Sequence, residues 1–472
     1  MTATENSSGS RLVQRLFERV DIASLAAFRI FFGALMFASV VRFWAYGWIR
    51  DIYIAPPFHF HWLGFSWISP WPGVGMYIHF AVLGLASLLV MLGLFYRAGA
   101  ALFFVTFTYV ELVEKATYLN HYYLVSLLSL LMIFMPLHHA ASIDALRKPH
   151  LRSDTAPAWV LWLLRFQIGI VYFFAGVAKL GPDWLLRGEP LGIWLSAHTG
   201  IPIVGPLLAE RWVAHAASLF GAAFDLSIVF FLLHARTRPY AYATVVVFHV
   251  ITGTLFPIGI FPWVMAGSAL VFFSPNWPRK LLAKLSWKRN AISENIEITP
   301  KEPAYSGRLS RMQRLGVALL CVHVVVQIGL PLRRFLYPGN TAWTEEGFRF
   351  AWRVMLVEKM GFVEYHVRDK STGRAFVVEP SQYLSPLQTK MMSMSPDMIL
   401  EFAKHIAAEE KRQGRDVEVR ADAFVTMNGR PSQRLVDPMV NLAAEEDSLW
   451  PKRWILPLKD EINVGYVSQK RH

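Results

Sequence analysis

Residues 158–180 read AWVLWLLRFQIGIVYFFAGVAKL, an apolar run that ends beside a lysine. A helix needs about 20 mainly apolar residues to cross the hydrocarbon core of a bilayer, so this stretch predicts a transmembrane helix. Outward from it in both directions, the sequence predicts eight more helices of this kind. They cover residues 24–46, 74–94, 98–114, 121–137, 212–233, 240–256, 259–274 and 314–332.

The composition of the whole chain is typical of a membrane protein. Of its 472 residues, 54% are hydrophobic and only 17% are charged, whereas soluble proteins average about 25% charged residues. The mean hydropathy is +0.34. These values exclude a disordered chain, a fibrous repeat and a highly charged soluble protein. The single cysteine, Cys321, excludes an intramolecular disulfide and any CxxC motif.

Lysine and arginine residues predict the direction in which the helices run. The net charge is +13, and basic residues concentrate at the N-terminus and around 147–152, 236–238 and 279–311. Nine alternating spans place all four segments on one side, which the positive-inside rule makes cytoplasmic. Because this topology explains the basic excess, we expect no nucleic-acid partner. The polar start of the chain also lacks the features of a cleaved signal peptide.

This topology divides the chain into three parts. Residues 1–23 are predicted to be a cytoplasmic segment. Residues 24–332 would form the transmembrane domain, with a cytoplasmic linker at about 275–313. The odd number of spans places residues 333–472 outside the cytoplasm. The predicted fold class is therefore an all-α integral membrane bundle of about nine helices, followed by a small extracytoplasmic α+β, β-rich domain.

The C-terminal part carries strand and turn signals. Segment 361–378 reads as two strands around a Lys-Ser-Thr-Gly turn, and segment 420–436 reads as two strands around Asn428-Gly429. An Asn-Gly pair between alternating apolar residues is a strong hairpin signal. Between the two, 395–413 fits an amphipathic helix.

Three ionisable residues lie within the predicted spans or at their ends: Lys179, His121 and His249. Such groups are costly at bilayer depth and mark functional sites by default. Structural alternatives stay open for each: snorkelling for the lysine, an interfacial aromatic belt for His121 and a helix–helix hydrogen bond for His249. In the predicted topology they lie towards the outer side and converge in one cavity. A base, a proton relay and aromatic walls there would suit a flat apolar ring.

Other chemistry-bearing motifs are weak. His138-His139 and His59-Phe60-His61 are too closely spaced for a metal site and have no cysteine or nearby carboxylate support. The two pairs are also predicted on opposite sides of the membrane. No P-loop, dinucleotide fingerprint or Ser-His-Asp order is present. We therefore expect no metal and no nucleotide cofactor.

Several different short motifs follow one another along the chain from about residue 24 to 460, and together they carry a family resemblance. They include Asn120-His121-Tyr122-Tyr123, Ala175-Gly176-Val177-Ala178-Lys179-Leu180, Asp183-Trp184, Phe248-His249, Leu255-Phe256-Pro257-Ile258-Gly259-Ile260-Phe261, Trp277-Pro278-Arg279-Lys280, Phe350-Ala351-Trp352 and Gln433-Arg434-Leu435-Val436-Asp437-Pro438. In these segments the chain resembles the vitamin K-dependent γ-glutamyl carboxylases, in the bacterial branch of HTTM-domain proteins.

The resemblance implies an enzyme that oxygenates vitamin K hydroquinone, as phylloquinol or menaquinol, to the 2,3-epoxide with O₂. The energy released would drive addition of CO₂ to a peptide Glu, giving γ-carboxyglutamate. The implied partners are a Glu-containing peptide or protein, the lipid bilayer and a quinone-epoxide reductase. The implied location is the bacterial inner membrane. The implied site comprises Lys179 as the catalytic base with His121 beside it, Asn120, His249, Tyr122 and Trp184 at the quinone, and Trp352, Phe348 and Met355 at the glutamate.

Two departures from the family pattern keep alternatives open. The family's Lys-Lys pair reads Ala178-Lys179 here, which keeps the second lysine. A family tyrosine in the glutamate segment reads Phe348, which lacks the hydroxyl. One alternative is therefore a quinol epoxidase that does not carboxylate Glu. Another is a membrane scaffold that kept the fold without the chemistry.

Overall fold

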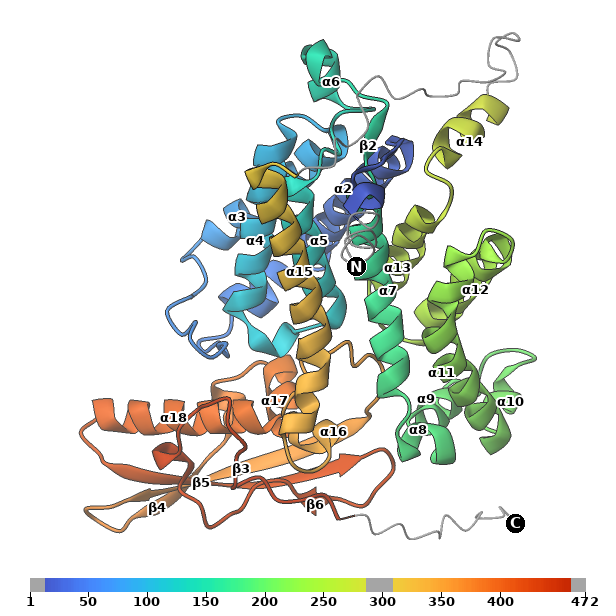
Figure 1. The fold of residues 1–472 in the computed structure, drawn as a ribbon. Coiled ribbons are helices and arrows are strands. Elements are labelled where there is room, and N and C mark those ends of the chain that lie inside the picture. Colours follow the sequence, from blue (N-terminus) through green and yellow to red (C-terminus); the bar gives the residue numbers. More distant parts are fainter. Residues whose placement is uncertain (1–12, 286–308, 460–472) are drawn as a thin grey trace, which may run out of the picture.

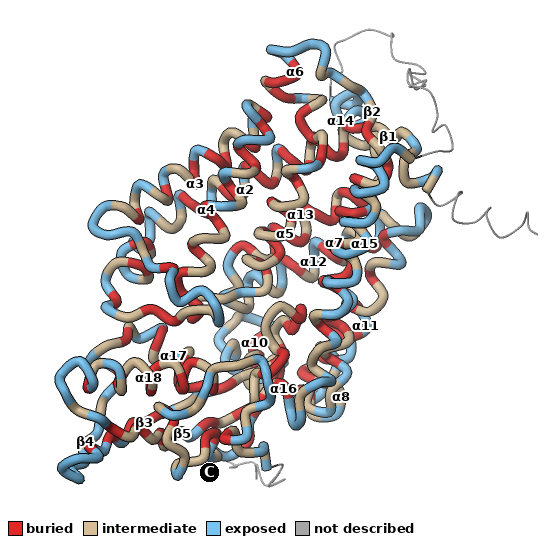
Figure 2. The backbone as a smooth tube through the Cα atoms, turned by 60° about the vertical axis from the view of Figure 1, so that its left-hand side comes forward, coloured by how far each residue is buried: buried red, intermediate tan, exposed pale blue. Residues whose placement is uncertain are grey.

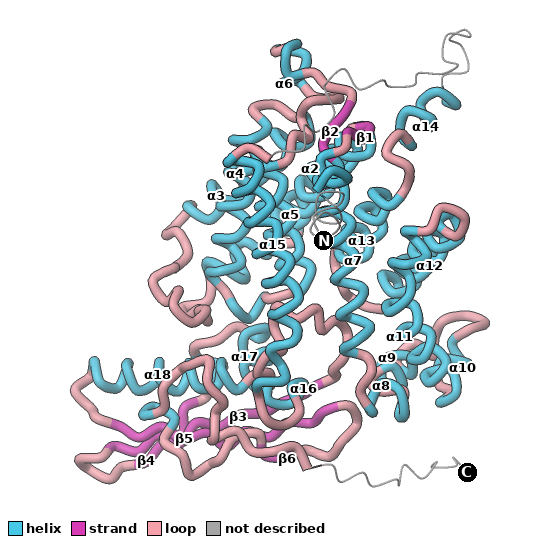
Figure 3. The backbone as a smooth tube through the Cα atoms, viewed as in Figure 1, coloured by secondary structure: helices cyan, strands magenta, loops and turns pink. Residues whose placement is uncertain are grey.

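The computed structural model describes residues 13–285 and 309–459. Figure 1 shows a bundle of long helices with a small β-sheet and its own helices at one end. Figure 3 separates these parts by secondary structure: the four-stranded sheet lies wholly in the end region, and the bundle holds only a short two-stranded ribbon. The expected combination of a helical membrane bundle with a small C-terminal β-sheet is confirmed.

Six helices of the described chain are long and apolar enough to cross a membrane, which makes this a multi-pass membrane protein. Each coincides with a predicted span. They are α2 (Ala23–Ala45), α3 (Gly75–Leu92), α4 (Tyr96–Val113), α7 (Ala158–Ala178), α11 (Arg211–Leu233) and α15 (Arg311–Leu332), which continues as a 3₁₀ turn to Leu336.

The three other predicted spans are helical too. They are α5 (Asn120–Phe134), α12 (Arg238–Leu255) and α13 (Phe261–Ser268), which a 3₁₀ turn extends to Phe272. The first and third are shorter than a typical membrane-crossing helix, and α12 is less apolar than the six. A count of nine crossings therefore stays a prediction.

Burial identifies α7 as the central helix. In its most apolar window 72% of the residues are buried, against 39% for α3 and α11 and 11% for α15. Figure 2 shows the same contrast, with exposed residues along the outer faces of the peripheral helices. A helix that is apolar all round belongs in the centre of a bundle. The stretch that predicts the fold is thus also its core.

Arg29 of α2 joins helix ends inside the bundle. Its guanidinium is fully buried and donates to the carbonyl oxygens of Val90, Met91, Leu137 and Ala141. The first two are carbonyls in the last turn of α3, where intrahelical partners run out, and Val90 O also accepts from the N–H of Gly93 at 3.2 Å. A buried arginine here therefore satisfies backbone acceptors that lipid would leave unpaired.

The described basic segments gather at the end of the bundle opposite the β-sheet (Figure 1). There Arg279 of α14 (Trp277–Leu285) pairs with Asp21 at 3.0 Å and with Asp154 at 2.8 Å. Asp21 ends β1 (Arg19–Asp21) and Asp154 directly precedes β2 (Thr155–Pro157), the two strands of the ribbon, and α6 (Ile143–Arg147) lies nearby. Residues 1–12 of the N-terminal segment and 286–308 of the linker lie outside the described residues.

The C-terminal sheet has the order β4-β3-β5-β6 and is antiparallel throughout. Both predicted hairpins are present: β3 (Lys359–Asp369) with β4 (Ala375–Val378), and β5 (Val417–Met427) with β6 (Gln433–Arg434). Alternate residues of β3 and β5 are buried, which gives the sheet one apolar face. The predicted helix is α18 (Pro396–Arg412), which packs against β5, and α17 (Pro386–Met394) precedes it.

Ionic and polar contacts hold the sheet region against the bundle. Lys115, just beyond α4, pairs with Asp397 at 3.1 Å and with Glu401 at 2.8 Å, both on α18. Glu114 accepts a hydrogen bond from Gln388 of α17 at 2.7 Å. Phe60 and Ala116, from loops of the bundle, belong to the same apolar core as the sheet. The two parts therefore share a packed interface.

Close approach of α7 and α11 depends on Gly176. A Cβ at this position would lie 2.7 Å from the backbone nitrogen of Leu226, a distance that requires the helices to move apart. Small residues at such crossings let membrane helices pack backbone to backbone. Gly176 is three residues before Lys179, and Leu226 follows Asp225, so this crossing sets the separation between those two side chains.

Replacing Gly176 with alanine should therefore destabilise the bundle by about 1–3 kcal/mol, the usual cost of overpacking. The measurement is the thermal unfolding midpoint of detergent-purified protein. Gly181→Ala is the matched control, because nothing lies within 4 Å of its added Cβ and its φ of −80° suits any residue. Equal midpoints for the two variants would contradict this account of the crossing.

Candidate active site

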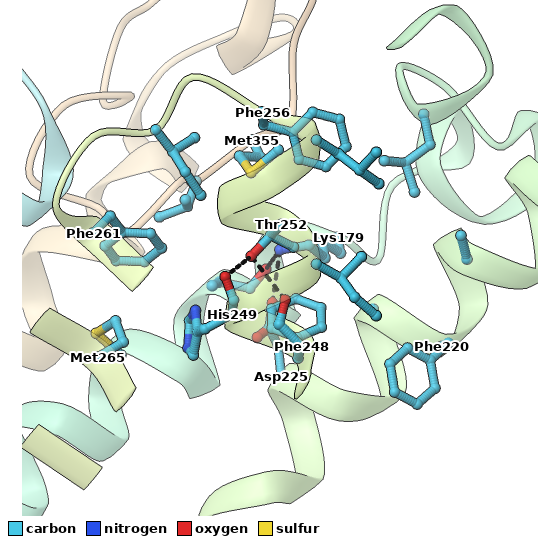
Figure 4. A pocket seen from close by; sticks show the side chains of 18 of the residues that line it. Lys179, Phe220, Asp225, Phe248, His249, Thr252, Phe256, Phe261, Met265 and Met355 are labelled. Atoms are coloured by element: carbon cyan, nitrogen blue, oxygen red, sulfur yellow. Dashed lines mark hydrogen bonds and ion pairs between the residues drawn. The ribbon is translucent and has the colours of Figure 1, made fainter. Parts of the chain in front are cut away.

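A cavity of about 340 Å³ lies between α7, α11, α12 and α13, at the end of the bundle that faces the sheet. Its volume falls in the range of small-molecule sites, about 300–1,000 Å³. Most of the wall is apolar, with aromatic rings such as Phe248, Phe256 and Phe261 around the polar groups (Figure 4). The polar side chains that reach it are Tyr172, Lys179, Asp225, Thr244, His249 and Thr252.

Lys179 is the C-cap of α7, and its side chain turns into the cavity. The ammonium Nζ lies 2.7 Å from Asp225 Oδ2 and 5.0 Å from the ring centroid of Trp184. Both charged residues are only 5% exposed. The lysine therefore does not extend to the water interface, and its charge is balanced by a carboxylate from α11.

Trp184 forms one wall beside this pair. The helix α8 (Pro182–Arg187) begins directly after Lys179, and its proline at the first position starts a new helix direction. The indole N–H donates to the carbonyl of Ser218 at 2.7 Å. This bond fixes the ring between α8 and α11, where it covers the lysine.

His249 of α12 stands across the cavity from α7. Its Nε2 lies 2.8 Å from the hydroxyl of Tyr172, and its ring packs edge-on against Phe261. The other ring nitrogen, Nδ1, is buried and has no hydrogen-bond partner among the described residues. One nitrogen is thus held by the protein and the other is available to a ligand.

His121 approaches the site from behind Phe261. Its ring centroid lies 5.6 Å from that of Phe261, and its buried Nε2 has no partner within the described chain. The side chain itself does not line the cavity. The expected convergence of three residues thus holds for Lys179 and His249, while His121 reaches the cavity wall only through Phe261.

Tyr122 does not reach the cavity, contrary to the expectation from sequence. It lines a separate small void with Glu111 and Phe107. The physical reason is helical geometry, since neighbouring residues on α5 point about 100° apart. Asn120 also stays outside: its Nδ2 donates to the carbonyl of Arg353 at 3.1 Å, and its Oδ1 accepts from the hydroxyl of Tyr118.

Segment 345–355 forms the side of the site nearest the sheet. Met355 lines the cavity directly. Trp352 is fully buried and stacks on Tyr123 at 4.9 Å, and Phe348 lies under the guanidinium of Arg353. Four non-glycine residues of the segment have φ between +52° and +60°, namely Glu345, Phe350, Trp352 and Met355. Such strain, of order 1–3 kcal/mol each, concentrates at ligand sites and needs strong support from the surroundings.

Histidine pairs outside the cavity have ordinary partners. His138 stacks on Tyr96, and His61 lies 3.2 Å from Glu401. Within residues 13–285 and 309–459, no group of three His, Cys, Asp or Glu side chains is arranged to hold a metal ion.

Two protein-family models match the chain and show which family it belongs to. Residues 17–277, more than half of its length, match the HTTM domain, and residues 312–461 match the lumenal domain of vitamin K-dependent gamma-carboxylase. The chain belongs to the vitamin K-dependent gamma-carboxylase family. No solved structure matches it. The resemblance carried by the short motifs is thereby confirmed, and the C-terminal sheet region is the family's lumenal domain.

Asp183 ties this lumenal domain to the end of α7. It lies four residues after Lys179 and accepts two hydrogen bonds from Arg430, at 2.7 and 2.8 Å, and one from Asn428 at 3.0 Å. Asn428 also accepts from the backbone N–H of Glu358 and donates towards the carbonyl of Leu356. The β5–β6 turn thus holds both the lysine helix and the chain that follows Met355.

The electrostatics of this clamp favour an ionised Asp183. Partial burial raises the pKa of its carboxyl, but the hydrogen bonds from Arg430 and Asn428 and the positive charge of Arg430 outweigh burial and lower it overall. A lowered pKa means that the folded state prefers the charged form. The clamp therefore persists at neutral and mildly acidic pH.

Sequence reasoning missed three residues that the structure places in or beside this site: Asp225, Tyr172 and Asp183. A usable signal existed for the first, since Asp225 is the sole acidic residue of the predicted span 212–233. The rule that intramembrane ionisable residues mark sites applies to it as much as to Lys179. The pairing of Asp183 with a hairpin 245 positions away carries no local signal.

Arg430→Ala should lower the free energy of unfolding by about 1.5–3 kcal/mol near pH 7, because a partly buried Asp183 loses its two hydrogen bonds from Arg430 and keeps only Arg187, at 2.7 Å, and Asn428. The effect should shrink as the pH falls below about 4, the pKa of an unfolded aspartate, since protonation of Asp183 removes from the wild type the ion pair with Arg430 that the variant already lacks. Denaturant unfolding of both proteins over this pH range measures it.

The matched control is Arg434→Ala in the same hairpin. Arg434 pairs with Asp422 while half exposed, and exposed pairs contribute about 0–1 kcal/mol. If Arg430→Ala were as mild as this control at pH 7, the clamp would not support the domain junction.

Proposed function

We propose that this chain is a vitamin K-dependent γ-glutamyl carboxylase with epoxidase activity. It would convert vitamin K hydroquinone, O₂, CO₂ and a peptide Glu into the 2,3-epoxide, γ-carboxyglutamate and water. The observation that carries the proposal is Lys179, a buried lysine that lines an apolar ring-sized cavity in a chain of this family. The cofactor is the hydroquinone itself, and the proposal requires no metal.

Lys179 suits the role of the base that deprotonates the hydroquinone. No side chain is basic enough to remove a γ-proton from Glu, because useful catalytic pKa values lie near the operating pH. A phenolic hydroxyl is a far stronger acid and lies within reach of an amine. Oxygenation of the deprotonated quinol then supplies the stronger base, and the apolar wall would keep water from quenching it.

The remaining site residues have complementary roles in this proposal. His249 would hydrogen-bond the quinone through Nδ1, since its Nε2 is held by Tyr172. Trp184 would stack against the ring from the side of the lysine. His121, one aromatic ring away, would bind a ligand atom or a reaction intermediate that reaches past Phe261. Tyr122 has no quinone contact in this arrangement.

The cavity also suits the long apolar tail of phylloquinol or menaquinol. Its rim includes Phe220 of α11 and Val247 and Ile251 of α12, which are 51–57% exposed although they lie on membrane helices. Exposed apolar residues at this depth face lipid. A tail can therefore leave the cavity between α11 and α12 and lie in the bilayer while the ring stays beside Lys179.

The glutamate would enter from the lumenal side, where segment 345–355 closes the cavity. Met355 touches the cavity, while Trp352 and Phe348 support the segment from behind. Because Phe348 lacks a hydroxyl, a quinol epoxidase without Glu carboxylation is the second candidate. A scaffold without chemistry is disfavoured, since a buried Lys179–Asp225 pair beside an apolar cavity is costly to keep without a use.

We propose a bacterial inner-membrane location with a cytoplasmic N-terminus and an extracytoplasmic lumenal domain. The basic segments around α6 and α14 support this orientation, because they lie at the end opposite the lumenal domain. In such a setting the natural reductant of the epoxide would be a membrane quinone-epoxide reductase.

A paired assay on detergent-purified protein tests the function. With vitamin K hydroquinone, O₂, labelled CO₂ and a Glu peptide, the wild type should give both epoxide and incorporated label. Lys179→Ala should lose at least about 100-fold in both products, the usual contribution of a positioned base, while quinone still quenches tryptophan fluorescence. Unchanged epoxide formation in this variant would remove Lys179 from the mechanism. Epoxide without label in the wild type would favour the second candidate.

Asn120→Ala should uncouple the two products. The variant loses the hydrogen bond to the Arg353 carbonyl, which stabilises the strained segment next to Met355 by about 1 kcal/mol. The segment is then less firmly held in the position that would bind the glutamate. The ratio of label to epoxide should therefore fall several-fold, while epoxide formation stays within about twofold of wild type. A matched control is Thr254→Ala on α12, whose hydroxyl donates only to its own helix. An unchanged ratio in Asn120→Ala would show that Asn120 does not act through the glutamate segment.

A further inference from the structure

We propose that Asp225 is the final acceptor of the hydroquinone proton, so that the base is the Lys179–Asp225 pair and not the lysine alone. This inference rests on the function proposed above and assigns a role to a residue of the same site. Asp225 is then a positioning and proton-accepting partner that acts through Lys179.

Asp225 and Lys179 lie close enough to exchange a proton directly. Asp225 Oδ2 lies 2.7 Å from Lys179 Nζ, a distance typical of a charge-assisted hydrogen bond. Within the described residues, the other acceptor of this ammonium is the carbonyl of Ala175, at a longer 3.5 Å. Both side chains are buried and both line the cavity. Proton exchange between them therefore needs no water and no rearrangement.

The charges of the resting pair decide which group can accept a proton. In the ionised form of this pair Lys179 is an ammonium, and an ammonium has no lone pair with which to accept a proton. It becomes a base only by giving a proton away. Asp225 is the nearest group that can take it, through the hydrogen bond that already exists.

The complete transfer then balances. The hydroquinone O–H bond breaks, its proton forms a new N–H bond at Lys179, and one ammonium proton forms an O–H bond at Asp225. The products are a hydroquinone monoanion, a lysine ammonium and a neutral aspartic acid. One negative charge has moved from the carboxylate to the substrate, and the ammonium stays between the two positions.

This route keeps the cavity electrically neutral throughout. Before the transfer the ammonium balances the carboxylate, and afterwards it balances the hydroquinone monoanion. If a neutral lysine acted alone beside an ionised Asp225, the site would start with an unpaired buried carboxylate. After the transfer it would hold two anions, the carboxylate and the hydroquinone monoanion, and one cation, the lysine ammonium. An uncompensated charge in a dry site costs several kcal/mol, so the shared route is favoured.

Few other titratable groups face Asp225. From α7 these are Lys179 and Tyr172, and from α12 there is His249, whose Nε2 bonds the hydroxyl of Tyr172. The residues that α8, α9 (Leu191–Ser196) and α13 contribute to the lining are Trp184 and apolar side chains. Within the described residues, the pair therefore has no competing charged group on the cavity wall.

The decisive experiment follows protonation of the carboxyl directly. Vitamin K hydroquinone is bound anaerobically to detergent-purified protein, so that the reaction stops before oxygenation, and infrared difference spectra are recorded. The expected result is the carbonyl stretch of a protonated carboxyl together with the absorption of the hydroquinone monoanion. The carboxyl band should be absent in Asp225→Asn and shifted in Asp225→Glu. Ser227→Ala, on the same helix but off the cavity, should match the wild type.

A pH profile of epoxide formation gives an independent readout. At acidic pH, Asp225→Asn should lose about 100-fold in kcat with quinone affinity within about threefold of wild type, and the loss should shrink towards neutral and higher pH, because a buried lysine without its counter-charge turns into the free amine more readily. At high pH the lysine can begin as a free amine without a partner. Asp225→Glu should keep the wild-type profile and a substantial part of the rate.

The outcomes separate this inference from the function on which it rests. A wild type that forms no epoxide would overturn the proposed function. A wild type that forms epoxide, but shows either no monoanion or a monoanion without the carboxyl band, would overturn the role of Asp225 alone. Parallel pH profiles for wild type and Asp225→Asn would do the same.

Discussion

The buried ion pair of Lys179 and Asp225 sets conditions that the surrounding fold has to meet. Each charge is stable away from water only because the other lies 2.7 Å away, so α7 and α11 have to cross at a fixed and short separation. Gly176 permits that crossing because it has no side chain at the point where Leu226 passes. Trp184 then covers the pair from the side of the lumenal domain, held by its bond to Ser218. Bundle packing, helix ends and cavity shape are thus coupled to one interaction.

The lumenal domain extends the same coupling towards the second substrate. The β5–β6 turn reaches Asp183, four residues beyond the lysine, and through Asn428 it also holds the chain after Met355. Strain in segment 345–355 is supported from the other side by Asn120 and by the hydroxyl of Tyr118, which binds the N–H of Phe350. In the proposed reaction, two reactants that have to meet within bond-forming distance would thereby be placed by two parts that pack against each other.

Sequence patterns predicted those features that depend on a segment's own residues. Apolar length located the long helices of the bundle, and Asn428-Gly429 located a hairpin whose turn residues both have positive φ. Lys179 and His249 were found because ionisable residues are rare in membrane helices. Periodicity does not say which neighbour a face will meet, so the partners of these residues stayed hidden. Asp225 is 46 positions from Lys179, and Tyr122 was assigned to a cavity that its helix turns it away from.

The position of the cavity follows from the different solubilities of the proposed substrates. A quinol with an isoprenoid tail is concentrated in the bilayer, whereas a peptide glutamate is confined to water. A site open to lipid between α11 and α12 and closed by a lumenal segment lies where both can arrive. Such a boundary site cannot rely on bulk water to accept a proton, because water would also destroy the strong base that the reaction needs. In the proposed mechanism a fixed pair of lysine and aspartate resolves this conflict, since it would move the proton without admitting solvent and leave no charge uncompensated.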